Sequence, residues 1–122
     1  MKYKIYCIFS RESLKALGGN RGKFAAQAGH AYLHSFWNSE ALYPELAYAY
    51  RHSEHAYKIC LIVDTNEELE KLYLEYRAIC GTTRVVDSAF TVLEHPMLTC
   101  VGIGPISEEH MTESLKSLKV LI

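Results

Sequence analysis

The sequence predicts an α/β protein, a three-layer sandwich in which a mixed four-stranded sheet is flanked by helices on both faces. Short runs of apolar and β-branched residues alternate along the chain with longer segments of helical apolar spacing. The connection between the third and fourth runs is about ten residues long and has no helical pattern, which is short for a parallel crossover. We therefore expect a largely parallel sheet whose last two strands pair antiparallel.

The first strand and the first helix are expected on either side of a polar loop. Residues 3–9 alternate aromatic and β-branched side chains, which predicts a strand. Residues 10–21 are polar and contain Gly18-Gly19-Asn20, which predicts a loop. From Gly22 to about Phe36, small side chains predict a helix that can approach a sheet closely.

A second helix and a second strand are expected next. The helix is predicted from a cap at Asn38 or Ser39 to about Arg51, and Pro44 either interrupts or starts it. Residues 57–63 form a continuous apolar run with β-branched content, which is typical of a strand that is buried on both faces.

A third helix follows a cap at Asp64 or Thr65, with acidic residues placed favourably in its first turns. Gly81 is expected to end it. Its apolar stripe consists of Leu69, Leu72, Tyr73, Tyr76 and Ile79.

The last part of the chain predicts two more strands and one helix. The strands are expected at residues 83–87 and 98–104. The helix is expected at residues 107–118, with Pro105 just before it.

The composition fits one domain that spans residues 1–122. Of these residues, 49% are apolar and 22% are charged, and 13 basic against 14 acidic residues give a net charge of −1. One core of ordinary size fits this length, but two domains do not. The apolar runs are far shorter than the ~20 residues of a membrane-spanning helix, and the N-terminus lacks a signal-peptide core. We expect neither a secreted nor a membrane protein.

The cysteines predict a reducing compartment. The four are at least twenty residues apart and form no C-x-x-C pair. Three lie in strand-like runs, where cysteine behaves as a small buried apolar residue. We expect a cytoplasmic protein with no metal site and no cofactor.

Basic residues gather near the N-terminus. Residues 1–24 hold six Lys and Arg against Glu12 alone, a local charge of +5, whereas residues 37–80 hold four basic and eight acidic residues, a local charge of −4. This asymmetry indicates either an anion-binding edge or a group of solvated surface lysines.

Two polar features are expected at one edge of the sheet. Ligands of α/β sheets bind beyond the carboxyl ends of the strands, where helix N-termini also point. The loop after the first strand brings Arg21, Gly22 and Lys23 there, and the third strand ends there at Asp87. A carboxylate that takes a proton from water, beside cationic and N–H donors, suits hydrolysis of an anionic ester. The alternative is a solvated lysine and an aspartate that caps a turn.

A polar line marks one face of the first helix. Lys23, Gln27, His30 and His34 follow one another at i, i+4, i+7 and i+11 among alanine and aromatic residues. The line either fronts a cleft or is the solvent face of the helix. His30 is also compatible with a core histidine bonded to backbone.

The segment GKFAAQAGHA, residues 22–31, resembles the G-K-x-x-A-Q-x-x-H-A signature of the type 2 peptidyl-tRNA hydrolase family. The resemblance spans nearly the whole chain. It continues through residues 58–64, 67–69, 85–87, 91 and 101–105.

This resemblance implies a fold and an activity. Members of the family have a mixed four-stranded sheet flanked by helices, and they often form dimers. They hydrolyse the ester that joins a peptide to the 3′ end of tRNA, in the cytoplasm and without a metal. Peptidyl-tRNA is therefore the implied partner, bound through its phosphate backbone and 3′ end, and a homodimer is one expectation.

The resemblance also implies roles for individual residues. The catalytic residues carried over to matching positions are Lys23, Gln27, Asp87 and Thr91. In this assignment Asp87 positions or deprotonates water, Thr91 hydrogen-bonds the ester region, and Lys23 stabilises the anion. Charge near the N-terminus would hold the tRNA, which makes binding sensitive to salt. The residues expected to bind substrate are Arg11, Lys15, Arg21, Gly22 and His30.

The chain departs from the family at one motif. Where the family has D-x-G-R-T-Q, residues 87–92 read DSAFTV, so the glycine, arginine and glutamine are absent. Phe90 does not replace an anion-binding arginine in kind. Two functions therefore follow: a divergent, metal-independent ester hydrolase, or an inactive relative of the same fold that binds nucleic acid or protein.

Overall fold

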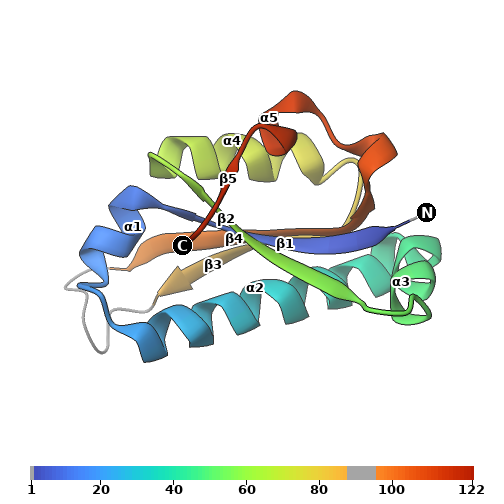
Figure 1. The fold of residues 1–122 in the computed structure, drawn as a ribbon, viewed down its shortest axis with the longest axis horizontal. Helices are drawn as coiled ribbons and strands as arrows, with labels where there is room; N and C mark the ends of the chain where they lie inside the picture. The colour runs from blue at the N-terminus through green and yellow to red at the C-terminus, as the bar shows by residue number, and fades with distance from the viewer. Residues whose placement is uncertain (1, 88–95) are drawn as a thin grey trace.

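A computed structural model describes residues 2–87 and 96–122, and in them one mixed sheet is flanked by helices (Figure 1). The described residues form five strands, not the predicted four, in the order β3-β4-β1-β2-β5. The strands are β1 (Tyr3–Ser10), β2 (Tyr57–Val63), β3 (Thr82–Asp87), β4 (Met97–Ser107) and β5 (Lys119–Val120).

The sheet is less parallel than predicted. Strands β1 and β2 are parallel, whereas β1 and β4, β3 and β4, and β2 and β5 pair antiparallel. The antiparallel pairing of β3 with β4 was expected from their short connection and is confirmed. The prediction of a largely parallel sheet was wrong because β4 inserts antiparallel between β3 and β1.

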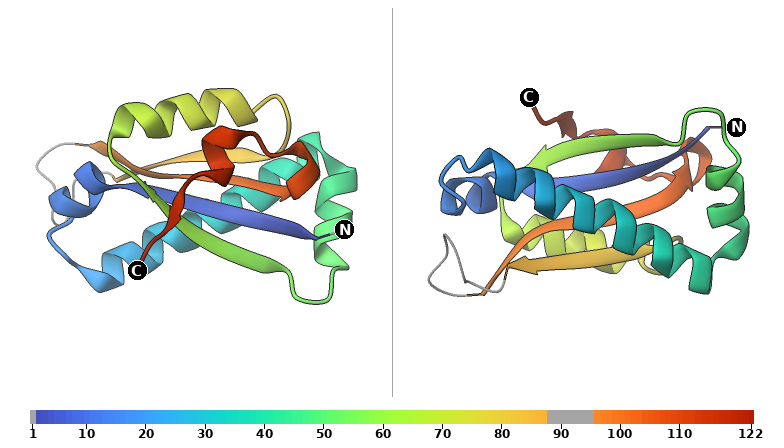
Figure 2. Two further views of the ribbon diagram at one scale, coloured as in Figure 1. Left: turned by 45° about the horizontal axis from the view of Figure 1, so that its top comes forward. Right: turned by 90° about the horizontal axis from the view of Figure 1, so that it is seen from below.

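Helices lie on both faces of the sheet (Figures 1 and 2). Helix α2 runs along one face, and α4 and α5 lie against the other. The helices are α1 (Arg11–Ala16), α2 (Arg21–Leu42), α3 (Pro44–Arg51), α4 (Asn66–Tyr76) and α5 (Glu113–Lys116), with a 3₁₀ turn at Glu108–His110.

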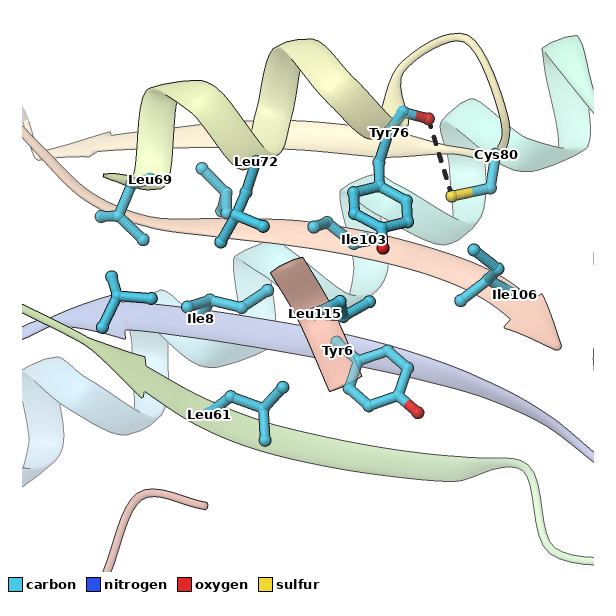
Figure 3. Packing of buried hydrophobic residues seen from close by; sticks show 12 residues of the cluster. Tyr6, Ile8, Leu61, Leu69, Leu72, Tyr76, Cys80, Ile103, Ile106 and Leu115 are labelled. Atoms are coloured by element: carbon cyan, nitrogen blue, oxygen red, sulfur yellow. Dashed lines mark hydrogen bonds between the residues drawn. The ribbon is translucent and has the colours of Figure 1, made fainter. Parts of the chain in front are cut away.

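Side chains of β1 alternate between two apolar clusters, one on each face of the sheet. Tyr6 and Ile8 belong to the cluster beneath α4, and Cys7 and Phe9 belong to the cluster beneath α2. Figure 3 shows the first cluster, in which Tyr6, Ile8 and Leu61 of the sheet face the apolar stripe of α4. The predicted stripe is confirmed at Leu69, Leu72 and Tyr76, which are all buried.

Two helix boundaries differ from the prediction. The polar stretch after β1 contains α1, because Ser10 and Ser13 form a reciprocal capping box. Helix α2 continues through Asn38 and Ser39, the predicted caps of a new helix, and that helix instead begins at Pro44. Proline fits a first helical turn because the N–H that it lacks has no helical acceptor there.

The C-terminal segment also differs from the prediction of one helix over residues 107–118. Strand β4 continues past Gly104 to Ser107, and Pro105 lies where the register between β1 and β4 shifts. A 3₁₀ turn and the short helix α5 follow, and β5 then pairs with Leu61 and Ile62 of β2. These contacts are tertiary, so no local periodicity predicts them.

Within the described residues, no helix has the length and apolar character needed to cross a membrane.

Candidate active site

Helix α2 approaches the sheet closely through small residues on one face. Its buried residues are spaced by four: Gln27, Ala31, Ser35 and Ser39. A β-carbon added to Gly102 of β4 would lie 2.4 Å from the carbonyl oxygen of Ala31. The Ser35 hydroxyl lies 2.7 Å from the carbonyl oxygen of Gly104. The expected close approach of this helix is confirmed, and it fixes how far the first turn of α2 stands from β3.

The first turn of α2 is held by its N-cap. The Asn20 side-chain oxygen accepts a hydrogen bond from the backbone N–H of Lys23, with 3.0 Å between oxygen and nitrogen. Lys23 therefore begins the polar line on a helical turn whose position is fixed, while Arg21 and Gly22 before it are exposed.

Asp87 reaches the same place from the end of β3. Its side chain lies on the same side of the strand as that of Val85, which packs in the cluster beneath α2. A register shift between Val85 and Val86 interrupts the pairing with β4, and Thr99 donates its hydroxyl to the Val85 carbonyl at 3.1 Å. Such irregularities often re-aim side chains next to functional sites.

Lys23 and Gln27 converge on one oxygen of the Asp87 carboxylate. The Lys23 ammonium lies 2.9 Å from Oδ2, and the Gln27 amide donates an N–H to the same Oδ2 at 3.1 Å. The Asp87 side chain is 0% exposed and that of Lys23 is 23% exposed. A carboxylate so buried requires charged and hydrogen-bonding partners, and this pair supplies both.

The whole polar line of α2 fronts a cleft of about 300 Å³. Lys23, Gln27, His30 and His34 line it from the helix, and residues 83–87 of β3 line it from the sheet. The cleft alternative for the polar line is therefore the correct one, and His30 is exposed there, not a core histidine. The rings of His30 and His34 lie 5.6 Å apart.

The remaining predicted substrate contacts lie outside this cleft lining. Arg11 and Lys15 are exposed on α1. The Arg11 guanidinium is paired with the Asp64 carboxylate at 3.0 Å. A phosphate that binds Arg11 must therefore compete with the Asp64 carboxylate for the guanidinium, or share the guanidinium with it.

Thr91 and residues 88–92 of the altered motif lie outside the described residues. The structure therefore describes three of the four predicted catalytic residues. Residues 83–86 of β3 also line the cleft, and the sequence analysis did not predict this wall. The sequence contained a signal for this wall, because it predicts a strand that ends at the site. The residues that precede the end of such a strand lie along the same edge.

The cleft places a carboxylate next to an ammonium, an arrangement that suits acid–base chemistry. In the described part of the chain, no group of three or more His, Cys, Asp and Glu side chains is arranged to hold a metal. A carboxylate next to an ammonium can accept a proton from water while the cation stabilises developing negative charge.

Comparison with known proteins identifies similar sequences over nearly the full chain. The family model described as Peptidyl-tRNA hydrolase PTH2 matches residues 4–121. A peptidyl-tRNA hydrolase of Methanococcus vannielii is 33% identical over 117 residues, which cover 93% of this chain and 96% of that protein. A probable peptidyl-tRNA hydrolase 2 of Schizosaccharomyces pombe is 33% identical over 105 residues, which cover 85% of this chain and 51% of that protein.

Proposed function

Since the chain belongs to the peptidyl-tRNA hydrolase PTH2 family, we propose that it hydrolyses the ester between peptide and tRNA at the cleft formed by Lys23, Gln27 and Asp87. The observation that carries this assignment is the convergence of the Lys23 ammonium and the Gln27 amide on Asp87 Oδ2, at 2.9 Å and 3.1 Å. Attack of water on an ester requires groups of these kinds.

Asp87 acts as the base in this proposal. The carboxylate takes a proton from a water molecule as the water oxygen bonds to the ester carbonyl carbon. The tetrahedral intermediate then collapses, the bond to the 3′ oxygen of the tRNA breaks, and the proton passes to that oxygen. Peptide acid and free tRNA leave, and Asp87 is again a carboxylate.

Lys23 stabilises the anion that forms on the ester carbonyl oxygen. In the resting site the positive charge of Lys23 offsets the negative charge of Asp87, and the Lys23 side chain is 23% exposed. As Asp87 takes up a proton, the negative charge moves to the substrate oxygen, and the ammonium follows it over a short distance. Gln27 is a positioning residue, because its amide contacts the Asp87 carboxylate. Thr91 stays a predicted ester contact from the family resemblance.

The tRNA part of the substrate is proposed to meet the basic N-terminal segment. Arg11, Lys15 and Arg21 are exposed on α1 and at the start of α2. Gly22 adds a backbone N–H in the first turn of α2, where a helix favours anions. Phosphate contacts of this kind weaken as salt rises.

Two further family properties are proposals for this chain. The four cysteines in the described residues are free, which supports a reducing compartment such as the cytoplasm. A homodimer is proposed from the family resemblance, and sedimentation of the purified chain tests it.

The deciding experiment is release of peptide from purified peptidyl-tRNA. We expect Asp87→Ala and Lys23→Ala to lower the rate by about 10²–10³ relative to the unmodified chain. Lys71→Ala is the matched control, because Lys71 is an exposed lysine of α4 whose partner is Glu67. Equal rates for all four proteins, none above the uncatalysed background, would eliminate the hydrolase and leave the inactive binding relative.

A further inference from the structure

The sheet-side wall of the cleft is an open strand edge. Strand β3 stands last in the sheet order, so among the described residues no strand pairs with its outer side. Figure 2 shows β3 as the outermost strand, with α2 running along the sheet beside it. Five consecutive residues, 83–87, line the cleft. One face of a strand contributes only alternate side chains, so a consecutive run means that the backbone edge itself forms part of the wall.

The register identifies which backbone groups point outward. Gly104 donates its N–H to the Gly81 carbonyl, and the next pair is Thr82 with Ile103. Hydrogen-bonded and non-hydrogen-bonded pairs alternate along an antiparallel ladder. The groups of Thr83 and Val85 therefore face β4, and the N–H and C=O groups of Arg84 and Val86 face the cleft side.

One outward group of β3 already has a partner, which marks an end of the open edge. The Asn38 side chain of α2 donates to the Thr82 carbonyl at 2.6 Å. Beyond it, the edge runs from Thr83 to Asp87, about 13 Å at strand spacing. Along α2, the distance from His34 to Lys23 is about 16 Å at helical rise. The two walls match in length and accommodate about four extended residues.

Resting on the function proposed above, we infer that the peptide part of the substrate binds as an added strand on the outer edge of β3. The ester must lie at Asp87 and Lys23, so the carboxyl end of the peptide lies there and its amino end lies toward Thr83 and His34. β3 runs in the same direction, and the added strand is parallel to it. Alternate peptide residues then exchange N–H and C=O bonds with Arg84 and Val86.

Backbone pairing would let one cleft accept peptides of different sequence. Main-chain hydrogen bonds supply affinity whatever side chains the peptide carries, because every non-proline residue has the same N–H and C=O groups. The exposed, polar helix wall of His30 and His34 is open enough to leave peptide side chains in solvent.

An N-methyl scan of the substrate tests this inference on the unmodified protein. The probes are N-acetyl-tetra-alanyl-tRNAs, in which the second, third and fourth residues from the ester all have amide nitrogens, with one N-methyl group at one of these three residues. Each inward N–H contributes a net hydrogen bond, so its loss raises KM about threefold to tenfold, with kcat little changed. We expect the third residue to differ from the second and fourth. Equal effects at all three positions, or no effect at any, overturn the added strand.

A pair of variants tests the same edge from the protein side. Val86→Pro removes an outward N–H from an edge strand, where proline is tolerated, and Val86→Ala shortens the same side chain but keeps that N–H. We expect KM for tetra-alanyl-tRNA to be about threefold to tenfold higher in the proline variant than in the alanine variant. N-acetyl-alanyl-tRNA is too short to reach Arg84, so its KM in the proline variant divided by its KM in the alanine variant should be near one.

The short substrate also separates the two proposals. Hydrolysis of N-acetyl-alanyl-tRNA together with a flat N-methyl scan overturns the added strand and leaves the hydrolase intact. Absence of hydrolysis for every substrate overturns both.

Discussion

The carbonyl oxygen of Ala31 lies 2.4 Å from the position that a β-carbon on Gly102 would take, so there is no room for a β-carbon between α2 and β4. This contact sets the distance between the helix that carries Lys23 and Gln27 and the sheet that carries Asp87. The alanine-rich face of α2 therefore has a functional consequence, because a bulkier helix would hold the ammonium farther from the carboxylate.

Gly102→Ala should both destabilise the fold and weaken the site. Its new β-carbon would lie 2.4 Å from the Ala31 oxygen, which is backbone and yields only by displacing α2. We expect a loss of about 1–3 kcal/mol in the free energy of unfolding. Urea denaturation measures it. Gly29→Ala is the control: nothing lies within 4 Å of its added β-carbon, so the helix should gain up to about 1 kcal/mol. Equal stabilities would contradict the close-approach argument.

Gln27→Glu should move the pH dependence of hydrolysis. A second carboxylate in place of the amide that now contacts Asp87 at 3.1 Å disfavours ionisation of Asp87. Because the base must be ionised, the acidic limb of the pH–rate profile should shift to higher pH. Gln27→Ala removes the donor without adding charge, and should lower the rate roughly tenfold to a hundredfold with a smaller shift. Superimposable profiles for the two variants would argue against Asp87 as the base.

Lys15→Ala should reduce the salt dependence of substrate binding. If Lys15 contacts one tRNA phosphate, the slope of log KM against log salt should fall by about one. Arg11→Ala should have a smaller effect, because Asp64 already pairs with that guanidinium. Kinetics over a series of KCl concentrations measure the slopes, with Lys71→Ala as the exposed control. A Lys15 slope equal to the control slope would remove α1 from the tRNA contact.

Cys60 should be the first thiol to react with iodoacetamide in the native protein. A hydrogen bond from Cys7 lowers the pKa of Cys60, whereas burial raises the pKa of Cys7 and raises that of Cys80 to about 12. Since the thiolate is the reactive form, Cys60 should label faster as pH rises toward its pKa, and Cys80 should stay protonated. Mass spectrometry of labelled peptides checks the order, and early labelling of Cys80 would contradict the packing of Figure 3.

The parts of the site that local spacing encodes were predictable from the sequence. Lys23, Gln27, His30 and His34 share one helical face because of their intervals, and Asp87 is the last residue of a short strand. The intervals did not decide between a cleft and a solvent face. That choice depends on β3 lying opposite the helix, which is a tertiary contact between segments distant in the sequence.

The parts of the fold that were missed depend on distant contacts. Helix α1 forms where glycines and polar residues predicted a loop, and its start is tied to the start of α4 through Ser10 with Asn66 and Arg11 with Asp64. Residues 107–118 have helical composition, but Tyr76 and Thr112 bond to each other and Leu115 enters the core, which leaves room for only one short helix. A strand of two residues, as in β5, is below what periodicity can reveal.

That small strand has a consequence for how copies of the chain meet. By lying along Leu61 and Ile62, β5 shields part of the border of the sheet opposite β3, and the Leu121 N–H extends this cover to the Cys60 carbonyl. Because strand addition at a single border of a sheet can join only two molecules, cover on the opposite border limits such contacts. A chain cut before Lys119 would present both borders, and such contacts could then propagate without limit into fibres.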